Sequence, residues 1–169
     1  NGELVGMTIG GSFAVPSIDF SPDGRVLAVV NGRLIRLREV GTERIGGTFQ
    51  SDAPLHRVEF SPDGSLLAAS ANDNLIRVWK TAQAYRTASP VYPKPLLLKG
   101  HSGAAGGYQA LVWKIVFSPD GRQLASAGGD GMLCLWDPAS GALLGSQPAH
   151  LRGVADIAFR RDGKAIASG

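Results

Sequence analysis

The sequence predicts an all-β protein built from short antiparallel strands, and three observations lead to this prediction. The motif Phe-Ser-Pro-Asp-Gly recurs along the chain. The 169 residues include 23 glycines and 10 prolines, which is above ordinary usage and implies many turns. Apolar and polar residues alternate in the short stretches between these turns, which is the period of a half-buried strand. Long helices are therefore not expected.

The repeated motif divides the chain into units of similar length. It begins at Phe20, Phe60 and Phe117, and a degenerate copy, Phe-Arg-Arg-Asp-Gly, begins at Phe159. The intervals are 40, 57 and 42 residues. A period of about 40 residues is typical of a four-stranded β-propeller blade. The longest interval is interpreted as the same unit with two insertions, so the sequence predicts about four blades.

Each unit carries signals for four strands in the same order. In the second unit an alternating segment, residues 55–60, ends at the motif Phe. Ser-Pro-Asp-Gly then makes a turn, because Pro fixes φ and Gly tolerates positive φ. The acidic residue of each motif, such as Asp63, is expected to stabilise its own turn. A second strand follows at residues 66–70, a third ends at Trp79, and a weaker fourth spans residues 96–98.

Several of these elements resemble the WD40-repeat family. They are Gly100-His101, the Ser-Pro-Asp-Gly turns, Leu124-Ala-Ser-Ala-Gly-Gly-Asp130 and Leu135-Trp136-Asp137. The resemblance covers nearly the whole chain, and the four copies in phase make it specific. The repeats are rich in Ala, Gly and Arg, which resembles the bacterial branch of the family.

The resemblance gives expected boundaries. Residues 1–10 are expected to be the outer strand of a preceding blade, residues 11–50 a first blade, 51–99 a second, 100–148 a third and 149–169 an incomplete fourth. An open arc of blades would expose apolar faces at both ends. We therefore expect the chain to be part of a larger closed propeller, completed by the rest of that propeller or by a second copy.

The WD40 family also implies a buried hydrogen-bonded network in its blades. The third unit has all of the family's residue types, and the second lacks its Ser because Ala69 stands there. We therefore expect Asp130→Ala to destabilise the protein more than Asp73→Ala. The expected network residues are His101, Ser126, Asp130 and Trp136 in the third unit, Asp73 and Trp79 in the second, and His150 in the fourth.

The same residue types invite a catalytic interpretation. A Ser, a His and an Asp can act as nucleophile, base and orienting group. In the family these side chains are buried, which leaves no room for a substrate, so no catalysis is expected. The sequence has no phosphate-binding loop and no zinc-ligand spacing, so no cofactor and no metal are expected. Arg36 and Arg77 are expected to hold their charged ends in water.

The resemblance implies a non-catalytic scaffold or sensor platform for protein–protein interactions, with a protein or peptide partner. The alternative is the propeller domain of, or gating domain for, an enzyme such as a signalling ATPase, kinase or protease. That alternative needs clustered His, Asp or Glu residues in the central channel, and the sequence indicates none. Scattered basic residues, a net charge of +3 and the single Cys134 favour a cytoplasmic protein without nucleic-acid or membrane partners.

Two insertions are candidate binding loops. Residues 102–110 carry Tyr108 and lie on the expected top rim, shortly before Trp113. Residues 81–95 belong to the bottom rim. Exposed aromatic side chains on loops are common binding anchors. We favour the top rim, with Tyr108 and Trp113 as anchors and Asn72 as a polar neighbour; alternatively, both insertions are neutral surface loops and Trp113 packs between strands.

Overall fold

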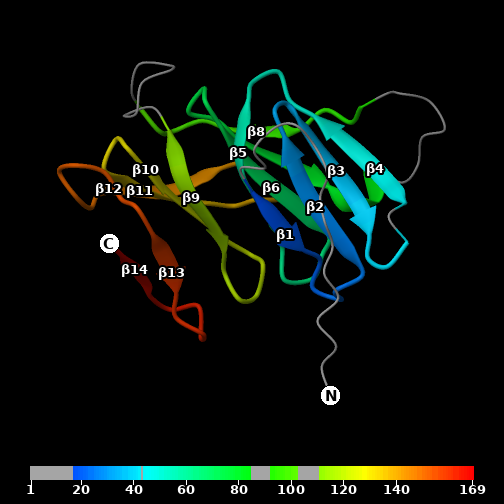
Figure 1. Cartoon of the computed structure of the whole chain (residues 1–169). Helices are drawn as coiled ribbons and strands as arrows, with labels where there is room; N and C mark the ends of the chain where they lie inside the picture. Colours follow the sequence, from blue (N-terminus) through cyan, green and yellow to red (C-terminus); the bar gives the residue numbers. More distant parts are fainter. Residues whose placement is uncertain (1–16, 43, 85–91, 103–110) are drawn as a thin grey trace.

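The computed structural model describes residues 17–42, 44–84, 92–102 and 111–169. These residues form three four-stranded antiparallel sheets and one two-stranded sheet, arranged side by side (Figure 1). The described part of the chain contains one short 3₁₀ helix, Thr81–Gln83, and no α-helix. The prediction of an all-β fold made of four-stranded antiparallel blades is therefore confirmed.

We refer to the four sheets as blades 1 to 4. The inner strands are β1, β5, β9 and β13, and β1 lies beside β5, β5 beside β9, and β9 beside β13. The strands are β1 Ile18–Phe20, β2 Val26–Asn31, β3 Leu34–Glu39 and β4 Ile45–Gln50 in blade 1; β5 Leu55–Phe60, β6 Leu66–Ala71, β7 Ile76–Lys80 and β8 Leu96–Leu98 in blade 2; β9 Val112–Phe117, β10 Leu124–Gly128, β11 Met132–Trp136 and β12 Leu143–Pro148 in blade 3; and β13 Ile157–Phe159 and β14 Ile166–Ser168 in blade 4.

The repeated motif forms the turn between the first and second strand of each blade. In blade 2, Asp63 Oδ1 accepts hydrogen bonds from Ser61 Oγ at 2.6 Å and from Ser65 N at 3.0 Å. Gly64 has a φ of +70°, a conformation that a side chain disfavours. The predicted role of the acidic residue is confirmed, because the same carboxylate-to-turn bonds are made by Asp23, Asp120 and Asp162.

Neighbouring blades pack face to face and bury most of the apolar side chains. The ring of Phe49 in blade 1 lies 5.4 Å from the ring of Trp79 in blade 2, centroid to centroid. Leu98 of blade 2 belongs to one buried cluster with Trp136 of blade 3. Complete burial of one such side chain contributes about 1.5–3 kcal/mol. Contacts between blades therefore hold the described part of the chain together.

The described ends of the insertion at residues 81–95 contact two different blades, blade 1 at one end and blade 2 at the other. A Cβ placed on Gly47 of β4 would lie 2.6 Å from the Cβ of Ala84, which follows the 3₁₀ helix. Only glycine permits this close approach. At the other end, Trp79 Nε1 donates a hydrogen bond to Pro93 O at 3.1 Å. Both ends are therefore fixed to the packed blades.

Apolar side chains remain exposed at both sides of the array. On blade 1, Ile18, Phe20 and Ile45 are 49%, 54% and 55% exposed. On blade 3, Leu143 and Leu144 are 43% and 53% exposed. A groove of about 470 Å³ runs between blades 3 and 4 and is lined in part by the partly buried Leu133 and Ile166. The expected outer strand at residues 1–10 lies outside the described residues. In the part of the chain that is described, no helix has the length and apolar character needed to span a bilayer.

Candidate functional site

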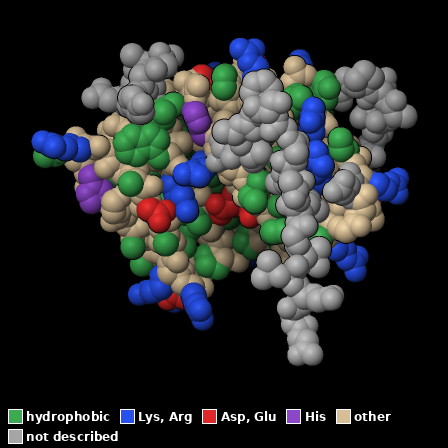
Figure 2. Space-filling model, viewed as in Figure 1, with side chains coloured by type: hydrophobic (Ala, Val, Ile, Leu, Met, Phe, Trp, Pro, Cys, Tyr) green, Lys and Arg blue, Asp and Glu red, His purple; other side chains and the backbone are tan. Residues whose placement is uncertain are grey.

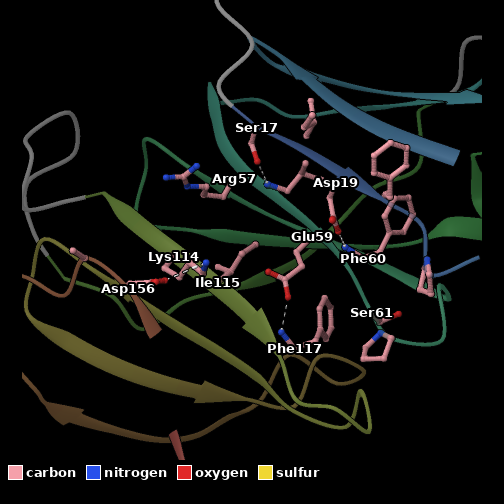
Figure 3. A pocket seen from close by; sticks show the side chains of 16 residues that line it. Ser17, Asp19, Arg57, Glu59, Phe60, Ser61, Lys114, Ile115, Phe117 and Asp156 are labelled. Carbon is pink, nitrogen blue, oxygen red and sulfur yellow. Dashed lines mark hydrogen bonds and ion pairs between the residues drawn. The ribbon is translucent and has the colours of Figure 1, made fainter. Parts of the chain in front are cut away.

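A hollow of about 710 Å³ lies between the inner strands of the blades (Figure 3). It is walled by β1, β5, β9 and the residues that precede β13. Figure 2 shows acidic and basic side chains gathered in the middle of this face. The charged residues that line the hollow are Asp19, Arg57, Glu59, Lys114 and Asp156. Three acidic and two basic side chains therefore face the space between the inner strands, where the sequence indicated no clustered His, Asp or Glu residues.

Two of these carboxylates connect adjacent blades. Asp19 Oδ2 accepts a hydrogen bond from Phe60 N at 2.7 Å, and Glu59 Oε1 accepts one from Phe117 N at 3.0 Å. In both cases the acidic residue precedes the motif Phe of one blade and binds the N–H of the motif Phe in the next. Inner strands are sheet edges, whose outward N–H groups need acceptors. The carboxylates supply them.

The junction between blades 3 and 4 is made by a different kind of contact. Val116 occupies the equivalent position in blade 3 and cannot accept a hydrogen bond. Instead, Lys114 Nζ lies 3.1 Å from Asp156 Oδ1, which connects blade 3 to the segment before β13. The Lys114 hydrogen bond and charge lower the pKa of Asp156.

The burial of the Asp19 and Glu59 carboxylates is not offset by the hydrogen bonds and charges around them. Burial raises the pKa of Glu59 to about 7, and the neighbouring charge of Asp19 adds to this effect. The bond from Phe117 N and the charge of Lys114 oppose the rise but do not cancel it. Burial also raises the pKa of Asp19, against the bond from Phe60 N. Burial in the hollow therefore raises the pKa of Asp19 and Glu59, whereas the pKa of Asp156, which pairs with Lys114, is lowered. The described residues contain no group of three or more His, Cys, Asp or Glu placed to hold a metal ion.

Trp113 lies beside the hollow. Its backbone oxygen accepts a hydrogen bond from Arg57 Nε at 3.1 Å. Its ring is half-buried against Gly153, where an added Cβ would come within 2.6 Å of the ring. Trp113 is thus partly packed and partly exposed, between the two alternatives expected from the sequence.

The other predicted rim residues are placed less fully. Asn72 lies in the turn between β6 and β7, and its N–H donates to Pro54 O at 3.0 Å. Its Oδ1 is buried and has no hydrogen-bond partner within the described residues. Asn72 belongs to blade 2 and Trp113 to blade 3. Tyr108 lies outside the described residues.

Blade 3 contains a continuous buried hydrogen-bond network. His101 Nε2 lies 2.7 Å from Ser126 Oγ, and His101 Nδ1 lies 3.0 Å from Asp130 Oδ2. Trp136 Nε1 donates to the same Ser126 Oγ at 2.7 Å. The side chains of His101 and Asp130 are only 2% and 5% exposed. Because Ser126 is fully buried, a substrate carbonyl has no access to its hydroxyl in this structure.

Blade 2 replaces this network with a buried arginine. Arg77 stands at the position of Cys134 in blade 3 and is 0% exposed. Its Nη1 donates to Asp73 Oδ1 at 2.9 Å, and its Nε donates to Asp52 Oδ1 at 3.2 Å. The expectation that Arg77 holds its charged end in water is wrong. Without the Ser and His of blade 3, the space between these acids accommodates a guanidinium.

The Arg77 contact also sets the ionisation of its partner. Burial alone would raise the pKa of Asp73, but the hydrogen bonds and charge of Arg77 outweigh it and lower the pKa. Trp79, which has no Ser partner, donates to Pro93 O instead. In blade 4, His150 Nε2 lies 3.2 Å from Ser168 Oγ in an exposed position.

A family model described as "WD domain, G-beta repeat" matches residues 45–80 and 95–137. Each match runs from the outer strand of one blade to the third strand of the next. The chain therefore contains WD40 repeats. Members of this family generally serve as non-catalytic scaffolds for protein interactions.

Curated relatives of this WD40 chain carry different names. It is 29% identical over 155 residues to actin-interacting protein 1 of Drosophila melanogaster, covering 88% of this chain and 23% of that protein. It is 30% identical over 79 residues to the U5 small nuclear ribonucleoprotein 40 kDa protein of Pongo abelii, covering 47% and 22%. It is 36% identical over 70 residues to protein HIR1 of Gibberella zeae, covering 41% and 6%.

The WD40 chain spans less than a quarter of the length of each of these relatives. All three come from eukaryotes, so the expectation of a bacterial-type protein is not borne out.

The sequence carries a pattern that marks two of the carboxylates in the hollow. When the motifs are aligned, the position before each motif Phe holds Asp19, Glu59, Val116 and Ala158. A charged residue that recurs at an inner-strand position is unusual for a sheet with a buried face. That alignment would have indicated the two carboxylates, but not their partners in the next blade.

Proposed function

We propose that this chain is a non-catalytic protein-interaction platform whose partner binds at the hollow and at the rim beside Trp113. The observation that carries the proposal is the hollow itself, where carboxylates and basic groups stand on rigid inner strands next to a half-exposed aromatic ring. Rigid elements that present charged groups beside an aromatic anchor are typical of protein-binding surfaces.

The proposed partner is a protein or peptide, and the proposed setting is cytoplasmic. Arg57 and Lys114 offer hydrogen-bond donors, and Trp113 offers apolar area at the edge of the hollow. Tyr108 and Asn72 are retained as proposed contacts on the same rim. We further propose that the apolar faces left open on blade 1 and beside blade 4 are covered by the rest of a propeller or by a second copy.

The experiment is partner capture with matched surface variants. The chain, Trp113→Ala and Tyr92→Ala are immobilised, and the proteins retained from a cell extract are compared by mass spectrometry. Tyr92 is the control, because it is 41% exposed and belongs to the other insertion. A protein retained by the chain and by Tyr92→Ala but lost with Trp113→Ala supports the proposal. Retention that is equal on all three, or lost only with Tyr92→Ala, contradicts it.

A further inference from the structure

The outer edge of blade 3 differs from the outer edges of blades 1 and 2. β12 is the last strand of its sheet, and all six of its residues are exposed (Figure 1). β4 and β8, which hold the same place in blades 1 and 2, each contain a buried residue. On β12, Leu143 and Leu144 are 43% and 53% exposed, and a Cβ added to Gly145 would meet no atom within 4 Å. β12 therefore forms an open edge that carries apolar side chains.

The register of β12 shows which of its backbone groups point outward. In an antiparallel pair, hydrogen-bonded and non-hydrogen-bonded residue pairs alternate. Ala149 N donates to Gly131 O at 2.9 Å, so every second pair along β11 and β12 from that point is a bonded one. Ser146 lies opposite Cys134, between two bonded pairs. The N–H and C=O of Ser146 therefore point away from β11, toward the unpaired side of the strand.

Charged residues flank the outer strands of blades 1 and 2 but not β12. Arg44 immediately precedes β4, and Lys99 immediately follows β8. By contrast, residues 138–149, which include the whole of β12, contain no Asp, Glu, Lys, Arg or His. An exposed strand edge is a template for pairing with another chain, and proteins commonly block such edges with charged side chains. β12 lacks this protection, and only Pro148, which has no N–H to donate, limits the length of an added pairing.

We propose that β12 is a self-association edge, at which β12 of a second copy of this chain pairs antiparallel in a symmetric dimer. An uncharged strand meets its own copy without the like-charge repulsion that two copies of β4 or of β8 would bring together. With the two-fold axis at Ser146, the N–H of each copy donates to the C=O of the other. A symmetric contact of this kind closes at two chains. The inference does not rest on the proposed function, because β12 is not among the elements that wall the hollow.

The pairing also removes apolar surface from water. Leu143 and Leu144 would be covered in part by the second strand. Beside β12 runs the groove of about 470 Å³, which is lined by Leu133 and Leu135 of β11 and by Gly145. Because Gly145 has no side chain, it leaves room at this point for a side chain of the second copy. Burial of apolar area is the main driving force for association, so the backbone bonds and the leucines act together.

Sedimentation velocity of the whole chain over a series of concentrations measures the association, and we expect a monomer–dimer equilibrium. Leu144→Lys places like charges close together across the contact and should weaken the dimer by about tenfold or more. Ile45→Lys is the matched control, because Ile45 is 55% exposed on β4, and it should leave the dimer unchanged. A chain that stays monomeric, or a dimer that depends on Ile45 or does not depend on Leu144, overturns the proposal.

Ser146→Pro tests the backbone pairing directly. The outward N–H of Ser146 takes no part in the sheet of blade 3, and proline is tolerated on an edge strand for this reason. The circular dichroism spectrum should therefore stay unchanged while the dimer is lost. In the unaltered chain, hydrogen exchange of the Ser146 amide should slow as the concentration rises, whereas that of Thr48, at the equivalent position of β4, should not. Exchange of Ser146 that is independent of concentration, or a folded Ser146→Pro chain that still dimerises, contradicts the proposal.

Discussion

Arg77 donates two hydrogen bonds to the carboxylate of Asp73, from Nη1 to Oδ1 at 2.9 Å and from Nη2 to Oδ2 at 2.6 Å. This two-pronged contact is the strongest geometry available to an arginine and a carboxylate. Asp73 occupies in blade 2 the position that Asp130 occupies in blade 3, where it meets His101 instead. Two neighbouring blades therefore anchor the same acidic position with different partners.

This contact changes the expected order of two destabilising substitutions. Asp130→Ala removes a buried acceptor from His101 and Ser102 N and should cost about 1–3 kcal/mol of unfolding free energy. Asp73→Ala leaves the guanidinium of Arg77 buried with only the exposed Asp52, and breaking a buried ion pair costs about 3–5 kcal/mol. Because Asp73 is 30% exposed, we expect the lower end of that range. Asp73→Ala should therefore lower the free energy of unfolding at least as much as Asp130→Ala. This is the reverse of the order expected from the sequence.

Chemical denaturation of both variants measures the two losses. A clearly smaller loss for Asp73→Ala would show that Asp52 alone satisfies Arg77.

Acid should weaken the Arg77 contact. The hydrogen bonds and charge of Arg77 lower the pKa of Asp52, and they outweigh burial to lower that of Asp73. A carboxyl whose pKa is lowered by folding stabilises the protein above its ordinary pKa of 3.8, and this contribution disappears as the pH falls below that value. We expect thermal stability to fall below about pH 4, and to fall less steeply in Arg77→Met. Equal slopes for the two proteins would count against the role of Arg77.

Gly47→Ala should weaken the connection between blades 1 and 2. The added Cβ would lie 2.6 Å from the Cβ and 2.8 Å from the backbone oxygen of Ala84. Overpacking of this kind costs about 1–3 kcal/mol. Ala84→Gly in the same chain removes one of the two clashes and should restore part of the loss. Thermal unfolding of the single and double variants tests this, and a double variant no better than Gly47→Ala would place the strain elsewhere.

Once a partner is identified, Tyr108→Ala and Trp113→Ala should each weaken its binding by about 1 kcal/mol or more. Tyr92→Ala should leave binding unchanged. Deletion of residues 81–95 is not a suitable control, because Ala84 and Pro93 contact the packed blades. Titration calorimetry measures the three affinities. A loss confined to Tyr92→Ala would place the partner on the opposite rim.

The repeats made the blades predictable, since each motif Phe ends an inner strand and each Ser-Pro-Asp-Gly forms the following turn. The Arg77 contact was not predictable from the sequence of its own strand. It depends on Ala69, which stands where blade 3 has a serine, and on Asp52, which lies 25 residues away in the preceding loop. The carboxylates of the hollow have partners even farther off: Asp19 and Phe60 are 41 residues apart, and Glu59 and Phe117 are 58 apart. The sequence pattern within one unit does not show which backbone groups of the next unit lie opposite its side chains.

The junctions between neighbouring blades are made by different kinds of contact. The first two junctions use carboxylates that bind backbone N–H groups, whereas the third uses Lys114 and Asp156, whose side chains are 37% and 73% exposed. Ion pairs open to solvent are weak and are screened by dissolved salt. Dissolved salt thus screens the Lys114–Asp156 pair between blades 3 and 4, whereas the buried apolar cluster that also joins these blades does not depend on charge.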